Sequence, residues 1–194
     1  MSSFQAETLE IPATMQERMR GTTWHEELPS PRLHELRLLL IPYLDFGGRD
    51  RLGQLVTAAP LAKQVHGIFA ELRGIEFPIA SMRPMIDFDG DDGRSMEANN
   101  SSCFNSRRII NTERISVHSY GAAIDINPIQ NPVIRDGVHR PQDGGAYLDR
   151  EQLRPGMIVS GCRALEIFGE AGWAWGGDWD NPKDYHHFYL PSFA

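Results

Sequence analysis

The residues of this 194-residue chain that could do chemistry gather in two short segments far apart in the sequence. The first, SVHSYGAAIDINP, contains His118 and Asp125. The second, DYHHF, lies near the C-terminal end and contains Asp184, His186 and His187. Neutral imidazole and carboxylate groups are good zinc ligands, and a catalytic zinc site needs three protein ligands and an open fourth position. Together the two segments supply enough ligands for such a site.

We expect the first segment to bring His118 and Asp125 together across a strand, a turn and a second strand. His118 follows the apolar and β-branched run ISV, and Gly121 permits a turn. In AIDIN the two isoleucines share one face of a strand, while Asp125 and Asn127 share the other.

The third ligand is one of the two adjacent histidines in the second segment. If HHFYL is extended, neighbouring side chains leave opposite faces, so only one of His186 and His187 can point at the metal. We favour His187. Three ligands leave the fourth position of a tetrahedral zinc to water, whose pKa falls to about 7, which is typical of a hydrolase.

Two further polar residues have a chemistry that suits such a site. Asp184 is not needed as a ligand, so it is the candidate for the general base that takes a proton from water and passes it to a leaving amine. Arg107, in FNSRR, is a candidate clamp for a substrate carboxylate or a developing oxyanion, because guanidinium offers paired donors in a fixed fork.

Taken singly, each of these residues is more often a hydrogen-bonding or turn residue than a ligand, so the prediction depends on the combination. Tryptophans between glycines, as in GWAWGGDW, more often close the edge of a core than line a groove. Surface or capping roles are the default for the four remaining histidines, which are His25, His34, His66 and His139.

Composition excludes several classes of protein. The chain is 41% hydrophobic and 23% charged, and no apolar stretch approaches the roughly 18 residues of a membrane helix. A formal charge of −7 has the wrong sign for a protein held to nucleic acid by its phosphates. Without a heptad repeat or an apolar patch to indicate a partner chain, we expect a monomer. The first ten residues lack the features of a secretory signal, so we expect any export to follow signal removal or another route.

The pattern of elements predicts an N-terminal arm over residues 1–31 and a single domain over residues 32–194. Apolar residues at helical spacing predict helices over Pro60–Leu72 and from about residue 160 to 169. The fold class we predict is α+β, with a small antiparallel sheet flanked by these helices. Its strands are expected at Leu36–Phe46, Glu76–Met82, Arg114–His118, Ala123–Asn127 and the closing segment HHFYLPSF.

The acidic segment DFDGDDGRSMEANN, residues 87–100, has the charge of a calcium loop but not its pattern. The template requires Gly at position six and Glu at position twelve, where this chain has Asp92 and Ala98. An exposed loop is the prediction for this segment. Cys103 and Cys162 could form one disulfide, but their spacing matches neither a zinc finger nor a redox pair.

From about Trp24 onward the sequence resembles the zinc peptidases that include bacterial D-alanyl-D-alanine carboxypeptidases, dipeptidases and phage L-alanyl-D-glutamate endolysins. The family motif Ser-x-His-x-x-Gly-x-x-x-Asp matches Ser116 to Asp125, and an acid-x-x-His pair matches Asp184 and His187. FNSR resembles the family's Phe-Asn-Cys-Arg segment, and WGGDW resembles the Trp-Gly-Gly-x-Trp that precedes the last ligand.

The resemblance implies that His118, Asp125 and His187 bind zinc and that Asp184 is the catalytic acid/base. It also implies that Arg107 and Ser116 help to hold the substrate, and that the fold is shared with the hedgehog signalling domain.

Three positions depart from the family pattern. Ser106 replaces the cysteine of many relatives, and His186 replaces a frequent Met or Pro. Asp184 stands where carboxypeptidases usually have Glu, which favours the endolysin-like branch.

We therefore expect a zinc-dependent peptidase that cuts an amide of the peptidoglycan stem peptide, between L-Ala and D-Glu, in the periplasm or cell wall. The alternatives are a D-alanyl-D-alanine carboxypeptidase and a non-catalytic cell-wall binding module that zinc stabilises.

Overall fold

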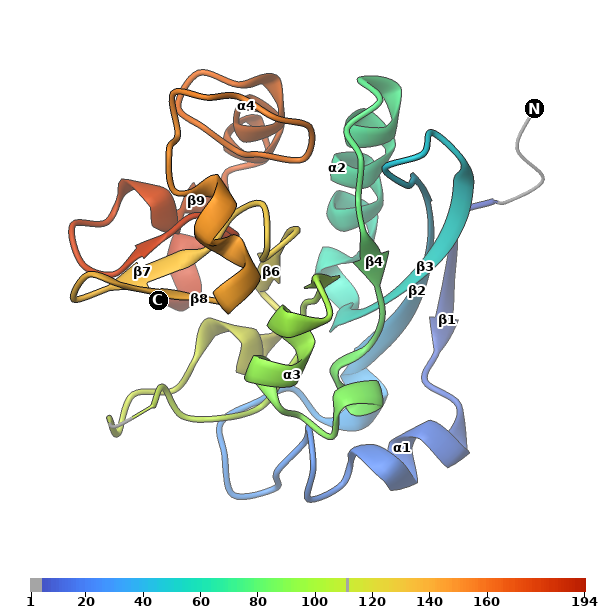
Figure 1. The fold of residues 1–194 in the computed structure, drawn as a ribbon. Coiled ribbons are helices and arrows are strands. Elements are labelled where there is room, and N and C mark those ends of the chain that lie inside the picture. Colours follow the sequence, from blue (N-terminus) through green and yellow to red (C-terminus); the bar gives the residue numbers. More distant parts are fainter. Residues whose placement is uncertain (1–4, 111) are drawn as a thin grey trace.

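The computed structural model describes residues 5–110 and 112–194 and shows the expected α+β protein (Figure 1). Small antiparallel sheets hold most of the strands, in the orders β1-β2-β3, β10-β7-β8 and β6-β11-β9, and β4 and β5 form a parallel pair. The strands are β1 Glu7–Glu10, β2 Leu36–Leu44, β3 Asp50–Ala58, β4 Ser81–Met82, β5 Asn100–Ser101, β6 Ala123–Asp125, β7 Val133–Arg135, β8 Val138–Arg140, β9 Ala174–Trp175, β10 Lys183–Asp184 and β11 His187–Tyr189. The α-helices are α1 Ala13–Met19, α2 Ala62–Gly74, α3 Asp92–Glu97 and α4 Arg163–Glu170.

Strand β2 confirms the strand predicted at Leu36–Phe46 and is buried on both faces, which explains its nearly continuous apolar run. Leu39 and Ile41 face the main core with α2, while Leu36 and Leu38 face a second cluster. Strand β1 pairs only with Arg37–Leu40 of β2, so Pro42 lies beyond the end of that ladder. Its missing N–H therefore costs no hydrogen bond to β1.

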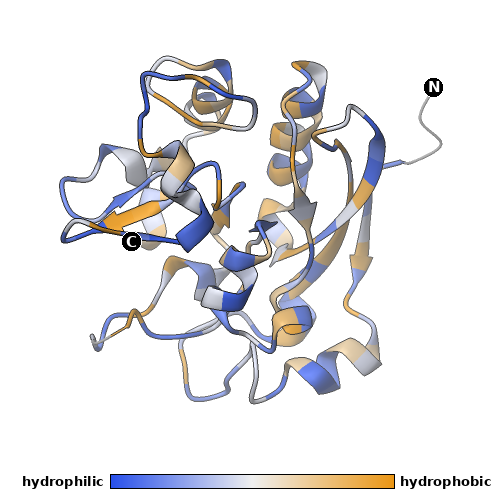
Figure 2. Cartoon of the chain, viewed as in Figure 1, coloured by the Kyte–Doolittle hydropathy of each residue, from blue (hydrophilic) through white to orange (hydrophobic). Residues whose placement is uncertain are grey.

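Both predicted long helices are confirmed, and they pack on the same core. Helix α2 follows a 3-10 turn, Ala59–Leu61, that has proline in its first turn, and it buries Val65, Ile68, Phe69 and Leu72. Helix α4 buries Phe168, whose ring stacks on Phe188 of β11 with centroids 3.7 Å apart. Figure 2 shows the apolar bands along α2, and its buried residues pack with Leu39, Ile41 and Leu55 of the neighbouring strands. The main core therefore joins the N-terminal sheet to β11.

The acidic segment is not the exposed loop that its composition predicts. It contains the end of a 3-10 helix, Met85–Phe88, and helix α3, which begins after Asp91. The Asp91 carboxylate accepts a hydrogen bond from the Arg94 backbone N–H at 3.1 Å, a helix N-cap, and Ser95 is buried. Polar capping rather than an apolar stripe forms this helix, so hydropathy alone could not reveal it.

Two predicted strands are also much shorter than expected. Only Ser81–Met82 of the 76–82 run is a strand, because Glu76 adopts a left-handed backbone conformation with φ 55° and Pro78 forms only an isolated bridge with Leu44. In the run 114–118, Ile115 forms an isolated bridge, and residues Val117–Tyr120 form a 3-10 helix instead. The run Ala123–Asn127 contributes β6, as predicted. The closing segment HHFYLPSF contributes β11, but its last part, Pro191–Phe193, is a 3-10 helix and not a strand.

The N-terminal segment carries a strand and a helix that the sequence pattern did not predict. Strand β1 pairs antiparallel with β2, and Ile11 and Met19 are buried in the cluster that contains Leu36. Strand β1, Ile11 and Met19 thus pack on the sheet, while a domain boundary at residue 32 stays a prediction.

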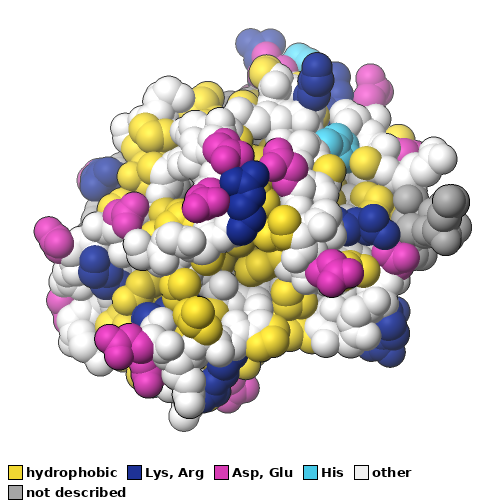
Figure 3. Space-filling model, turned by 90° about the horizontal axis from the view of Figure 1, so that it is seen from above, with side chains coloured by type: hydrophobic (Ala, Val, Ile, Leu, Met, Phe, Trp, Pro, Cys, Tyr) yellow, Lys and Arg dark blue, Asp and Glu magenta, His cyan; other side chains and the backbone are white. Residues whose placement is uncertain are grey.

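The described surface carries mixed charge and its helices are short. Figure 3 shows charges of both signs among apolar side chains on one face, without an extended basic field. None of the helices in residues 5–110 and 112–194 combines the length and the apolar character needed to cross a bilayer. Cys103 is buried, Cys162 is partly buried, and both are free thiols.

Candidate metal centre

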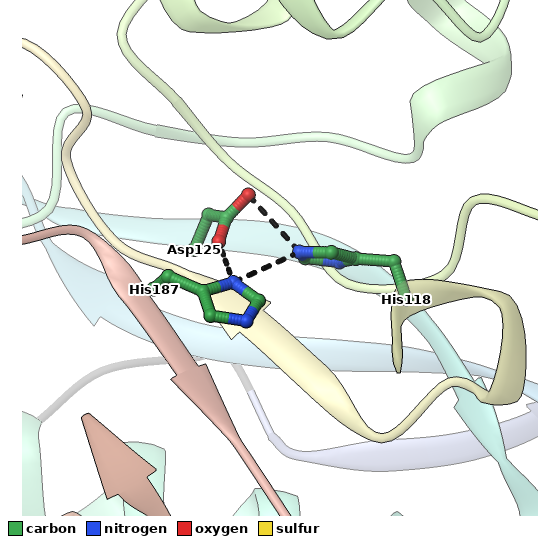
Figure 4. Close-up of side chains that lie close together, drawn as sticks. All are labelled: His118, Asp125 and His187. Atoms are coloured by element: carbon green, nitrogen blue, oxygen red, sulfur yellow. Dashed lines mark hydrogen bonds and ion pairs between the residues drawn. The ribbon is translucent and has the colours of Figure 1, made fainter. Parts of the chain in front are cut away.

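The antiparallel pairing of β6 with β11 places two candidate ligands opposite each other. Asp125, the last residue of β6, is the direct partner of His187, the first residue of β11. Side chains of directly paired residues project from the same face of a sheet, so the two meet. Figure 4 shows both side chains directed at His118, which comes from a separate turn.

His118 lies in a 3-10 helix, not on the predicted strand. Ser116 caps this helix, its hydroxyl accepting from the His118 backbone N–H at 3.4 Å, and Gly121 ends it with φ 63°. A Cβ on Gly121 would lie 2.6 Å from the Ala58 backbone nitrogen, so glycine is required for both conformation and space. The turn returns the chain directly into β6, which carries Asp125.

The backbone of residues 102–105 holds this turn and β6 in place. Ser102 exchanges two backbone hydrogen bonds with Asp125, of 3.0 and 2.9 Å, and the Asn105 N–H donates to the His118 carbonyl at 3.1 Å. The Cys103 carbonyl accepts from Nδ1 of His118. A carbonyl can only accept, so Nδ1 carries the proton and the Nε2 lone pair of a neutral His118 faces the other ligands.

The ligand atoms have the spacing of a tetrahedral zinc site. Nδ1 of His187 lies 2.9 Å from Asp125 Oδ1 and 3.2 Å from Nε2 of His118, which lies 3.3 Å from Asp125 Oδ2. Zinc bonds of about 2.0–2.1 Å place neighbouring ligand atoms roughly 3.3 Å apart in a tetrahedron. Three electron-pair donors converge on one point, so the chemistry of the group fits a divalent cation.

The charges around the site lower the pKa of Asp125 and raise the pKa of His118. Burial raises the pKa of Asp125, but the charges of His118 and His186 outweigh burial and hold that pKa well below its usual range. Burial lowers the pKa of His118, but the Asp125 carboxylate reverses this, and the net shift is upward. In the metal-free protein, protons therefore compete with a cation for this site.

Asp184 lies close to the ligand His187, and its carboxylate faces the neighbouring His186. Its Oδ1 is buried and lies 3.0 Å from Nε2 of His186. A Cβ on Gly176 would lie 3.0 Å from the Asp184 Cβ and 3.3 Å from the His187 Cβ, so both residues flank this glycine. Among the described residues, no hydrogen bond or ion pair joins Asp184 to His118 or His187.

Arg107 and Ser116 are connected to the turn that carries His118. The Ser116 N–H donates to the Arg107 carbonyl at 3.0 Å, and the Arg107 N–H donates to the Ser119 hydroxyl at 2.8 Å. The Arg107 guanidinium is partly exposed and its Nε pairs with Asp92 of α3. Ser116 is buried, so its visible contribution is to fix the backbone around His118.

Sequence reasoning missed the aromatic contacts that orient His187. Tyr189 stacks on the His187 ring with centroids 5.6 Å apart, and Trp179 packs against the same ring at 5.4 Å and donates to the Tyr189 hydroxyl at 3.1 Å. The alternation of a strand could have revealed Tyr189, which follows His187 by two residues. Trp173 and Trp175 are buried in the core, as predicted.

One comparison with known proteins gives a match. Residues 110–190 match a protein-family model described as D-alanyl-D-alanine carboxypeptidase. The matched region is less than half of the chain and contains the three candidate ligands and Asp184, but not Arg107. No curated protein and no solved structure matches the chain. The match supports a peptidase of the carboxypeptidase type.

We predict that the protein binds one zinc ion. His187→Ala should weaken binding by more than the roughly 10–100-fold that loss of a supporting partner costs, because it removes a direct ligand. Affinity should also fall as pH drops through the raised pKa of His118, since protons then occupy Nε2. Competition with a chromophoric chelator measures both effects. His139→Ala is the control, and equal zinc affinity for the two variants would contradict the ligand assignment.

We also predict that Gly176→Ala is destabilising. The added methyl group would lie 2.8 Å from the Asp184 carbonyl oxygen, which is backbone and cannot rotate away. Overpacking of this kind costs about 1–3 kcal/mol in the free energy of unfolding, measurable by urea denaturation. Gly67→Ala in α2 meets no atom within 4 Å and should be stabilising, because alanine favours a helix. An unchanged free energy of unfolding in Gly176→Ala would show that the fold does not require glycine at this close approach.

Proposed function

We propose that the protein is a zinc-dependent peptidase that hydrolyses an amide bond in the stem peptide of peptidoglycan. The observation that carries this proposal is the convergence of His118, Asp125 and His187 at ligand spacing, with Asp184 close to His187. The match of residues 110–190 to the carboxypeptidase family model supports the substrate class. Such a substrate lies outside the cytoplasmic membrane, so the protein would act in the periplasm or the cell wall.

Each polar residue of the site has a role in this proposal. His118, Asp125 and His187 hold the zinc ion. Zinc in a site with three protein ligands makes water acidic enough to supply hydroxide near pH 7 and polarises a carbonyl group. Asp184 takes a proton from the attacking water and delivers it to the leaving amine.

Arg107 binds a carboxylate of the substrate or the developing oxyanion. Asp92 pairs with Nε of its guanidinium and Nη1 makes a long hydrogen bond of 3.5 Å to the Arg108 carbonyl, so Nη2 is the nitrogen offered to a ligand. Ser116 supports this role through its hydrogen bond to the Arg107 carbonyl and its cap on the turn of His118.

Two bonds of the stem peptide are candidates. The acid at position 184 is Asp rather than the Glu usual in carboxypeptidases, which favours an endopeptidase that cuts between L-Ala and D-Glu. The description of the matching family favours removal of the terminal D-Ala instead. Mass spectrometry of digested muropeptides distinguishes them, because one reaction removes a single alanine and the other releases the peptide from the glycan.

We predict that the purified protein releases new amino termini from murein and that Asp184→Ala abolishes this release. The variant should still bind zinc, because Asp184 is not a ligand. Loss of a general acid–base group typically costs about 10²–10⁴ in rate. Asp143→Ala, at an exposed carboxylate on a 3-10 helix, is the matched control and should keep full activity. Normal cleavage by Asp184→Ala would remove Asp184 from the mechanism.

A non-catalytic binding module is the alternative function. It is favoured by one observation, which is that the described hydrogen bonds and ion pairs of Asp184 do not reach His118 or His187. Removal of zinc distinguishes the two. We predict that chelation abolishes murein hydrolysis while the circular dichroism spectrum changes little, because a 194-residue chain can bury a sizeable core without metal. A zinc ion that only stabilises the fold would instead leave an unfolded protein after chelation.

A further inference from the structure

His186 is a buried histidine that the proposed mechanism does not use. Only 4% of its surface is exposed, although it directly precedes the ligand His187. Its ring takes no part in the three-residue metal group. Instead, Nδ1 lies 2.8 Å from the Asn131 backbone carbonyl and Nε2 lies 3.0 Å from Oδ1 of Asp184. The ring therefore connects the interior of the protein to the candidate acid/base.

The carbonyl group that holds His186 belongs to a rigidly fixed residue. Asn131 is fully buried, and its side-chain oxygen accepts from the Ile158 N–H at 2.7 Å and from the Arg150 guanidinium at 3.0 Å. Its side-chain nitrogen donates to the Gly156 carbonyl at 2.9 Å. Bonds from several separate segments thus fix Asn131, and the His186 ring has little freedom to move.

The Asp184 oxygen that faces this ring depends on it. Oδ1 is buried, and no donor of the described residues makes a well-aligned hydrogen bond to it. Nε2 of His186 lies 3.0 Å from it and forms an ion pair with it. Both ring nitrogens of His186 face oxygen acceptors, so the ring carries both N–H groups as an imidazolium, with Nδ1–H directed at the Asn131 carbonyl and Nε2–H at Asp184. A buried carboxylate oxygen without a donor is costly, so removal of the imidazole would allow the Asp184 side chain to turn toward water.

We propose that His186 is a positioning residue that holds the Asp184 carboxylate beside the metal site. This inference rests on the proposed function, because it assigns His186 an effect that acts through Asp184. The ring transmits the fixed position of Asn131 to the carboxylate. His186 contributes neither a bond to zinc nor a contact with the substrate.

The test compares His186→Leu and His186→Gln with the control His66→Gln, a partly buried histidine on α2. Kinetics on a defined muropeptide should show that His186→Leu lowers kcat about 10–100-fold, part of the effect of an acid–base group, with KM and zinc affinity within about twofold of wild type. Glutamine can hydrogen-bond to both partners, so His186→Gln should recover part of the rate. His66→Gln should match the wild type.

If His186 acts through Asp184, the effects of substitutions at these two residues on the rate are not additive. In the Asp184→Ala background, His186→Leu should cause no further loss of rate. Melting temperatures of the metal-free proteins give a second readout, in which the shifts of His186→Gln and Asp184→Asn should not add in the double variant.

The failures of the two proposals are distinguishable. A wild-type protein without activity on murein would overturn the proposed function and the positioning role with it. With an active wild type, an unchanged kcat in His186→Leu, additive loss with Asp184→Ala or additive melting shifts would overturn the positioning role alone. A loss of zinc affinity would instead assign His186 to the metal.

Discussion

The register between β6 and β11 is the constraint on which the candidate site depends. These strands come from distant parts of the sequence, and their pairing sets Asp125 directly opposite His187. A slip of one residue would turn His187 to the other face and bring His186 to the site. The residue after the ligand fixes this register, because Phe188 is fully buried and stacks on Phe168 of α4. The apolar core thus decides which histidine meets the carboxylate.

Glycines allow the connecting segments to approach this strand pair closely. Gly121 lies against the backbone of β3, and Gly176 lies against the backbone of Asp184, and a side chain at either position would collide with main-chain atoms. The site is therefore assembled from tight turns between short strands rather than from one regular element. The positions of its polar groups depend on backbone packing, which tolerates much less change than an exposed side chain does.

The sequence predicts the fold where apolar periodicity decides the structure. Helices α2 and α4 and the buried strand β2 follow from their apolar residues. Elements that depend on polar contacts were missed or predicted wrongly. The cap of Asp91 forms α3, and the turn of His118 depends on Ser116 and on a carbonyl group distant in sequence. The candidate ligands were identifiable from residue type and motif spacing, but their supporting contacts join segments that no local pattern connects.

The protein uses one arrangement twice, and the difference between the two copies explains their different chemistry. In each, a backbone carbonyl fixes Nδ1 of a buried histidine, and Nε2 lies against a carboxylate: His118 against Asp125, and His186 against Asp184. Only the first pair has a third donor, because the strand register adds His187. Three converging electron-pair donors can bind a cation, whereas the imidazolium of His186 lies between two oxygen acceptors and holds the carboxylate of Asp184 in place. The same local device therefore suits a metal site in one position and the support of an acid in the other.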